Sequence, residues 1–179
     1  MFKKILFATS ATKDCAHAAR VSFNISNLYN AHMDILHVIE APGCADSLDV
    51  RDAGTKENIA VDDESVRVKA EIETCYAEEL SKIKSYEIKT PSGQSHLEIL
   101  REIRENKPDL VVMGGSAEGE GSSANKIESI GSTLQKVAAA SDYPVLIVSR
   151  KAASFWGSIT NVVFATDFSK ASDAAFAFA

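Results

Sequence analysis

The residues best suited to chemistry lie in a stretch rich in glycine and serine, residues 114–133. Glycines let backbone amides approach a phosphate closely, and a helix N-terminus adds oriented N–H donors and a favourable dipole. Gly131 precedes a helix-like pattern, and the hydroxyls of Ser132 and Thr133 would complete an anion cradle there. The spacing allows a phosphate-binding loop, although on its own it is more typical of a flexible Gly/Ser loop followed by a hydroxyl-capped helix.

The same stretch departs from the standard phosphate-binding motifs. It lacks Gly-Lys-Ser/Thr, which excludes a Walker P-loop, and its glycine spacing matches the dinucleotide fingerprint only superficially. Glu118 and Glu120 place negative charges where a phosphate would lie, and Lys126 is the only cation nearby in the sequence. These charges argue against a triphosphate ligand.

The sequence contains no recognised catalytic motif. It has no G-x-S-x-G elbow, no H-E-x-x-H and no cysteine with an obviously placed base. Cys15, Cys44 and Cys75 are widely spaced, so neither a disulfide framework nor a zinc site is indicated, and we predict Cys15 and Cys75 to be small packing residues on helices. His37 lies in a strand-like pattern and is predicted to be a hydrogen-bonded core residue. We therefore expect a protein that is not an enzyme and holds no metal.

Composition limits the class of partner. The chain has 179 residues, a net charge of −6 and 45% hydrophobic residues, which is the balance of a globular protein with one sizeable core. The negative charge and the lack of a basic patch disfavour nucleic acid as a partner. No apolar run reaches the roughly 18–20 residues of a membrane span, and the N-terminus lacks a signal-peptide pattern. We expect a cytoplasmic protein that binds neither nucleic acid nor membrane.

Strand-like and helix-like segments alternate along the chain, as in βαβ units. Five strands are predicted at residues 5–9, 33–39, 86–90, 109–115 and 144–148. Apolar residues at helical spacing predict helices at residues 11–29, 68–83, 95–107 and 127–137, the third with a Ser95/Glu98 capping box, and residues 41–64 are predicted to be an acidic surface loop. This order predicts a doubly wound α/β fold, a mostly parallel sheet with helices on both faces. Ligands bind such sheets outside the carboxyl ends of the strands, where residues 9–10 and the loop after Met113 should converge.

The sequence of the first predicted strand is repeated in part near the end of the chain. Residues 5–9 and 162–166 share Phe-Ala-Thr at an offset of 157 residues, and both segments continue into an alanine-rich helix pattern. We therefore expect one domain at residues 1–150, a linker at residues 151–158, and the first strand and helix of an incomplete second domain at residues 159–179. A lone strand and helix cannot bury their apolar faces, which favours a longer tandem protein.

Four segments together resemble the universal stress protein family. They are Lys-Ile-Leu-Phe-Ala-Thr at residues 4–9, Leu-His-Val-Ile at residues 36–39, Pro-Asp-Leu-Val-Val-Met-Gly at residues 108–114 and Pro-Val-Leu-Ile-Val at residues 144–148. The resemblance implies a five-stranded parallel sheet in the order 3-2-1-4-5, of the adenine nucleotide alpha hydrolase-like type. It also implies a homodimer, or pairing of tandem domains, through the last strand, from Val145 to Val148.

ATP-binding members of this family carry Gly-x2-Gly-x9-Gly-Ser/Thr. Gly121, Gly131 and Ser132 match its second half, whereas Glu118 stands at the place of the first glycine, and counting from Gly114 instead requires about four inserted residues. The acidic residue that follows the first strand in binding members is replaced here by Ser10. Asp167 keeps it in the second copy, so the second domain is expected to be the better binder.

The resemblance implies a set of nucleotide-binding positions. Thr9 and Val38 would lie near adenine and ribose, with Ser10 beside them. The phosphates would be surrounded by Gly114, Gly121, Gly131, Ser132 and Thr133. The leading hypothesis is a non-catalytic stress-response module that binds ATP or AMP weakly. Two alternatives stay open: a dimerisation or protein-interaction scaffold that binds no nucleotide, and a slow ATPase.

Overall fold

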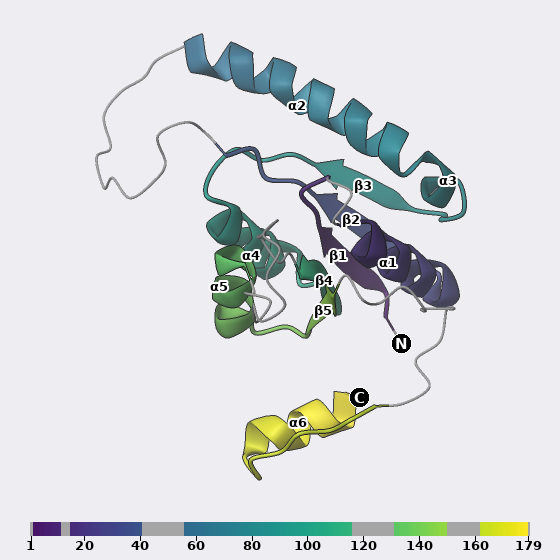
Figure 1. The fold of residues 1–179 in the computed structure, drawn as a ribbon, viewed down its shortest axis with the longest axis vertical. Coiled ribbons are helices and arrows are strands. Elements are labelled where there is room, and N and C mark those ends of the chain that lie inside the picture. Colours follow the sequence, from purple (N-terminus) through teal and green to yellow (C-terminus); the bar gives the residue numbers. More distant parts are fainter. Residues whose placement is uncertain (1, 12–14, 41–55, 116–130, 150–161, 179) are drawn as a thin grey trace, which may run out of the picture.

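The computed structural model describes residues 2–11, 15–40, 56–115, 131–149 and 162–178 (Figure 1). Five strands form one parallel sheet in the order β3-β2-β1-β4-β5, as expected from the sequence. The strands are β1 (Lys4–Ala8), β2 (His32–Leu36), β3 (Tyr86–Lys89), β4 (Leu110–Gly115) and β5 (Val145–Ser149). The helices are α1 (Ala16–Tyr29), α2 (Lys56–Cys75), α3 (Ala77–Leu80), α4 (Ser95–Asn106), α5 (Ser132–Ala140) and α6 (Lys170–Phe178).

The central strand β1 is buried on both faces of the sheet. Alternate residues point to opposite faces, so Ile5 and Phe7 join a core with α1, α2 and α3, whereas Leu6 and Ala8 join a core with α4 and α5 (Figure 1). Strands covered on both faces are apolar throughout instead of alternating, which explains the short apolar runs in the sequence. The doubly wound α/β prediction is confirmed.

Helix α2 corrects the expected acidic loop. The helix begins at Lys56, so the prediction of a loop up to residue 64 is wrong for its second half. Residues 56–64 contain Lys, Ala and Glu, which are good helix formers. Cys75, at the end of α2, is exposed, so its predicted packing role is wrong, while Cys15 is buried just before α1.

The predicted capping box of α4 does not form. The helix begins at Ser95, but Gln94 is its N-cap and no side chain caps it. Ser95 Oγ instead donates a hydrogen bond to Glu40 Oε1 at 2.5 Å, and Glu98 pairs with Arg101 at 2.8 Å. The serine therefore links α4 to the segment that follows β2.

Other helix boundaries agree in part with the prediction. Helix α1 begins at Ala16, later than the expected residue 11, and ends at Asn30, which is left-handed with a φ of 53°. Helix α5 begins at Ser132, and its buried Leu134 and Val137 match the predicted face. The preceding part of that prediction, residues 127–130, lies outside the described residues.

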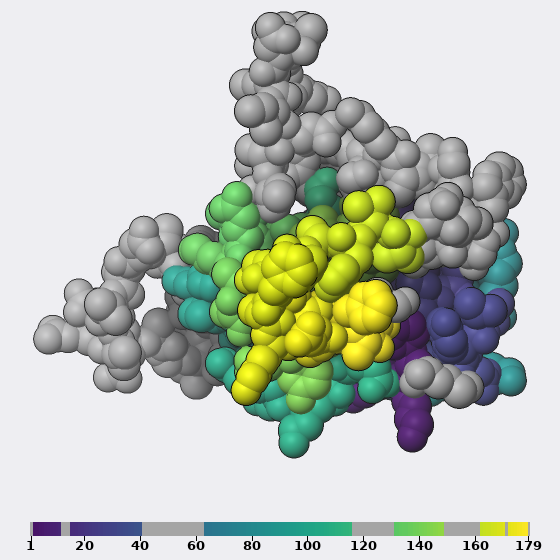
Figure 2. All heavy atoms as spheres, turned by 90° about the horizontal axis from the view of Figure 1, so that it is seen from below, coloured from purple at the N-terminus to yellow at the C-terminus, as the bar shows by residue number. Residues whose placement is uncertain are grey.

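The C-terminal segment adopts only half of its predicted structure. The helix is present as α6, but residues 162–167 belong to no strand, because no described strand pairs with them. Val163 is 96% exposed, whereas Leu6 at the equivalent repeat position is 1% exposed. Figure 2 shows the yellow C-terminal segment lying across the face seen from below, and the Phe2 and Phe178 rings are 5.8 Å apart. The expected linker, residues 151–158, lies outside the described residues.

Among the described residues, none of the helices has the length and hydropathy that a bilayer-spanning segment requires.

An aromatic cluster supports the carboxyl end of β1. The rings of Phe7, Phe23 and Tyr76 lie 5.6–6.3 Å apart, within the range of favourable aromatic contacts. The Tyr76 hydroxyl lies 3.1 Å from Thr9 Oγ1, and Thr9 directly follows β1. Burial of the phenol raises the pKa of Tyr76 to about 12.

The packing of α4 predicts unequal effects for two substitutions on that helix. Ile103 is 1% exposed beneath the sheet, whereas Leu97 is 50% exposed. Ile103→Ala should lower the free energy of unfolding by about 2–5 kcal/mol, because it removes buried methyl groups and leaves a cavity. Leu97→Ala, the matched control, should change it by about 0.5 kcal/mol or less. Urea unfolding measures both, and equal losses would contradict this packing.

The pKa of Tyr76 predicts how stability depends on alkaline pH. The unfolded phenol ionises near pH 10.0 and the folded one near pH 12, so the stabilisation is present below pH 10.0 and is lost as the pH rises toward 12. In Tyr76→Phe this part of the loss should disappear, while the contributions of lysines and other tyrosines remain. Urea unfolding of both proteins across this range measures the difference. Parallel pH profiles would show that Tyr76 ionises normally.

Candidate functional site

A cavity of about 360 Å³ lies at the carboxyl ends of β1, β2 and β4. The chain leaves β1 toward β2 on one side and reaches β4 on the other, so the cavity is at the point where the winding direction switches. Its walls come from the last residues of these three strands and the residues that follow β1 and β2, from Cys15 ahead of α1, and from the N-terminal parts of α4 and α5. The described lining residues with polar side chains, or with glycine, are Thr9, Ser10, Cys15, His37, Glu40, Ser95, Gly114, Gly131, Ser132 and Thr133.

Most of the predicted nucleotide-binding positions are brought together here. Seven of them line the cavity: Thr9, Ser10, Val38, Gly114, Gly131, Ser132 and Thr133. Gly121 lies outside the described residues. Asp167, the acidic residue expected for a second copy, is not among the lining residues, and its carboxylate accepts a hydrogen bond from the Ser169 amide at 2.9 Å ahead of α6.

The floor of the cavity is a hydrogen-bonded turn after β1. The Thr9 amide donates to Leu36 O at 2.9 Å, and Thr9 Oγ1 accepts a hydrogen bond from the Ala11 amide at 3.0 Å. Ala11 has a φ of 57°, in the left-handed region, so this turn bends sharply away from the strand. Together with the bond from Tyr76, these contacts fix the Thr9 side chain from below.

His37 was predicted to be a core histidine, but it is half-buried and lines the cavity. Its Nδ1 lies 3.0 Å from Thr9 O. Because a carbonyl oxygen can only accept, Nδ1 carries a proton and donates this hydrogen bond. The prediction that His37 is hydrogen-bonded is confirmed, while its assignment to the core is wrong.

The end of the cavity at α5 is rich in donors. Gly131 is the N-cap of α5, and no side chain caps it. The first amides of a helix have no acceptor within the helix, and the helix dipole adds a partial positive charge. The hydroxyls of Ser132 and Thr133 line the same wall. This end is therefore suited to an anionic group.

Gly114, in β4, lies close to the start of α1. A Cβ on Gly114 would lie 3.4 Å from Cys15 Sγ and 3.7 Å from the Cβ of Ala18, which are ordinary van der Waals contacts. Cys15 Sγ also lies 3.2 Å from Ser10 Oγ. The thiol thus forms part of the cavity wall, although the sequence indicated only a packing role.

Four lining residues with polar side chains were missed by sequence reasoning as members of a site: Cys15, His37, Glu40 and Ser95. The signal for Glu40 was available, because it follows the predicted second strand as Ser10 follows the first, and the same rule places both at the carboxyl edge of the sheet. His37 was expected inside that strand, which ends at Leu36. Cys15 and Ser95 carried no such signal, because helix packing brings them to the cavity.

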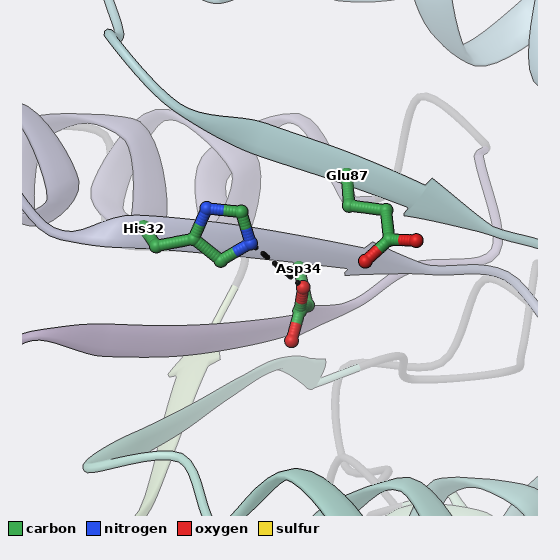
Figure 3. Close-up of side chains that lie close together, drawn as sticks. All are labelled: His32, Asp34 and Glu87. Atoms are coloured by element: carbon green, nitrogen blue, oxygen red, sulfur yellow. Dashed lines mark hydrogen bonds and ion pairs between the residues drawn. The ribbon is translucent and has the colours of Figure 1, made fainter.

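A second group of ligand-type side chains lies on the sheet face beneath α4. Figure 3 shows the imidazole of His32 turned toward Asp34, with Glu87 extending from the neighbouring strand β3. Nitrogen and oxygen atoms of the three side chains lie within 4.8 Å of one another, a spacing that can hold a metal ion. Asp34 is only 1% exposed, and His32 Nε2 lies 3.1 Å from its Oδ1.

Two lysine side chains already neutralise the carboxylates of the His32, Asp34 and Glu87 cluster. Asp34 Oδ2 lies 3.1 Å from Lys4 Nζ and 3.6 Å from Lys89 Nζ. Lys89 also pairs with Glu87 at 3.6 Å and forms a close ion pair with Glu102 of α4. Buried charge requires such pairing, and a cation would be repelled by two ammonium groups so close. The arrangement is suited to joining β1, β2, β3 and α4 by ion pairs.

Comparison with known proteins places the fold in a family. Residues 1–149 match the model of the Universal stress protein family. The solved structure of hypothetical protein MJ0577 is similar with 22% identity and a TM-score of 0.65, covering 84% of this chain and 97% of that chain. A universal stress protein in complex with cAMP has 17% identity and a TM-score of 0.58, covering 82% of this chain and 96% of that chain.

A universal stress protein from Archaeoglobus fulgidus in complex with dAMP has 15% identity and a TM-score of 0.55, covering 82% of this chain and 97% of that chain. No curated protein matches the chain. The structural likeness shows a shared fold, and the family model spans the whole sheet and its connections. The chain therefore belongs to the universal stress protein family.

Proposed function

We propose that the cavity binds an adenine nucleotide weakly and that the domain is a non-catalytic stress-response module. The observation that carries this proposal is the convergence of seven predicted positions on one cavity at the switch point of the sheet. Its volume of about 360 Å³ falls within the range of small-molecule sites. A nucleotide unites an anionic group and a planar apolar base, and this cavity combines donors at α5 with apolar side chains such as Val38, Ile99 and Met113.

A monophosphate suits the cavity better than a triphosphate. The two ligands named for structures of similar fold, cAMP and dAMP, each carry a single phosphate. In this chain the segment between β4 and α5 contains Glu118 and Glu120, whose charges would oppose additional phosphates. We therefore propose AMP as the preferred ligand, with ATP binding more weakly.

The composition of the cavity supports binding without turnover. Its described lining includes no lysine or arginine to stabilise the charge that develops on a transferred phosphoryl group. The donors at α5 are a backbone N-terminus and two hydroxyls, which bind an anion without activating a nucleophile. The proposed role is accordingly that of a binding module, not of an enzyme.

Calorimetric titration with AMP tests the proposed function. Wild-type protein should give saturable binding, and Gly131→Glu should weaken it at least about tenfold, because a carboxylate then occupies the donor end of the cavity. Gly131 has φ −55° and ψ 144°, which any residue adopts, so the substitution causes no backbone strain.

Gly131→Gln is the matched control, since it adds the same bulk without the charge. It should weaken binding less than Gly131→Glu does. Absence of saturable binding at millimolar AMP in the wild type would contradict nucleotide binding, and equal effects of the two variants would show that bulk, not charge, blocks the cavity.

A second candidate function is a dimerisation scaffold, and the edge strand β5 favours it. In the described part of the chain β5 pairs only with β4, and Ile147 is 42% exposed on it. We propose that β5 pairs with a second copy or with a tandem domain. We also propose that residues 159–179 begin that second domain, because their counterpart β1 is a central strand that needs neighbours on both sides.

Light scattering after gel filtration tests this second candidate. The wild type should have the mass of two chains, and Ile147→Asp should shift it to one chain, because a charge at the paired edge opposes association. Leu28→Asp is the control, since Leu28 is 66% exposed on α1, outside the sheet edge. A wild-type mass of one chain at all concentrations would contradict the homodimer.

A further inference from the structure

Glu40 is the only carboxylate in the described lining of the cavity. It lies two residues after Val38, in the segment that follows β2. Within the described residues its one hydrogen bond is accepted by Oε1 from Ser95 Oγ, at 2.5 Å. A carboxylate accepts at both oxygens and through about four lone-pair sites, so most of its capacity is left for a ligand.

Several contacts fix the position of this carboxylate. The preceding residue, Ile39, donates its amide to Pro91 O at 2.9 Å and accepts from the Gly93 amide at 3.0 Å. Ile39 also forms an isolated bridge with Ser92, so the backbone before Glu40 is tied to the segment ahead of α4. Ser95, the first residue of α4, then holds the side chain from the helix. Backbone and side chain are therefore anchored to the same neighbouring segment.

The Glu40 carboxylate makes one part of the cavity differ from the α5 end in the ligand groups that it can bind. The α5 end offers amides and hydroxyls to an anion, whereas Glu40 repels an anion and accepts hydrogen bonds from hydroxyl groups. A ligand with a phosphate at one end and hydroxyls at the other satisfies both ends in one orientation only.

We propose that Glu40, positioned by Ser95, is a specificity-determining residue that accepts hydrogen bonds from the ribose hydroxyls of the bound nucleotide. This proposal rests on the proposed function and deepens it, since it names the part of the ligand that the acidic wall recognises. The phosphate then lies at the N-terminus of α5, and the cavity favours nucleotides whose sugar offers a free hydroxyl to Glu40. Sites that hydrogen-bond a substrate hydroxyl discriminate against analogues that lack it.

Calorimetric titration with AMP and with dideoxy-AMP, which lacks both ribose hydroxyls, tests this proposal. Wild-type protein should bind AMP about tenfold more tightly, a modest ratio because Glu40 is exposed to solvent. Glu40→Ala should lose this preference by weakening AMP about tenfold and leaving dideoxy-AMP unchanged. Ser95→Ala should have an intermediate effect, because the carboxylate remains but is no longer held.

Glu73→Gln is the control variant, since Glu73 is an exposed residue of α2 and does not line the cavity. It should bind both ligands as the wild type does. Equal wild-type affinities for AMP and dideoxy-AMP, or a preference that survives in Glu40→Ala, would overturn the role of Glu40 while leaving nucleotide binding intact. Failure of the wild type to bind either ligand would contradict the proposed function and this inference together.

Discussion

The complete burial of β1 is the constraint on which the rest of the structure depends. Its neighbours β2 and β4 pair with it on both sides, and Ile5, Leu6 and Phe7 are at most 1% exposed. A strand enclosed in this way satisfies its backbone hydrogen bonds within the sheet, so polar chemistry is confined to the residues after it. The cavity forms at that point because the chain crosses to opposite sides of β1 to make β2 and β4.

The two faces of the sheet stabilise the site in different ways. On the α1 side, the aromatic cluster of Phe7, Phe23 and Tyr76 supports Thr9 from below through the Tyr76 hydroxyl. On the α4 side, Asp34 is buried among ammonium groups that tie the strands to the helix. The first face relies on apolar packing, whereas the second places charge beneath a helix, where several oppositely charged partners compensate it.

Much of the fold could be predicted from the sequence because parallel strands buried on both faces produce short apolar runs that alternate with helical periodicity. The errors concern segments where local signals mislead. Residues 56–64 are acidic and were predicted to be a loop, but they belong to α2. Ser95 and Glu98 have the spacing of a capping box, yet Ser95 turns to Glu40 and Glu98 to Arg101. An acidic segment can form a loop or a helix, and a serine with capping-box spacing can cap its helix or bond elsewhere. Local sequence does not distinguish these outcomes.

The sequence by itself determined the class of fold and the edge of the sheet at which a site would lie, because strand order and the positions after strands follow from local patterns. It also predicted a helix start at Gly131, Ser132 and Thr133, and α5 begins at Ser132 with Gly131 as its N-cap. Only the tertiary structure decided that Glu40 and Ser95 meet across 55 residues of sequence, and that His37 faces the cavity with its Nδ1 bonded to Thr9. The first contact depends on how α4 packs against the sheet and the second on how β1 pairs with β2, and no local pattern contains these relations between distant segments.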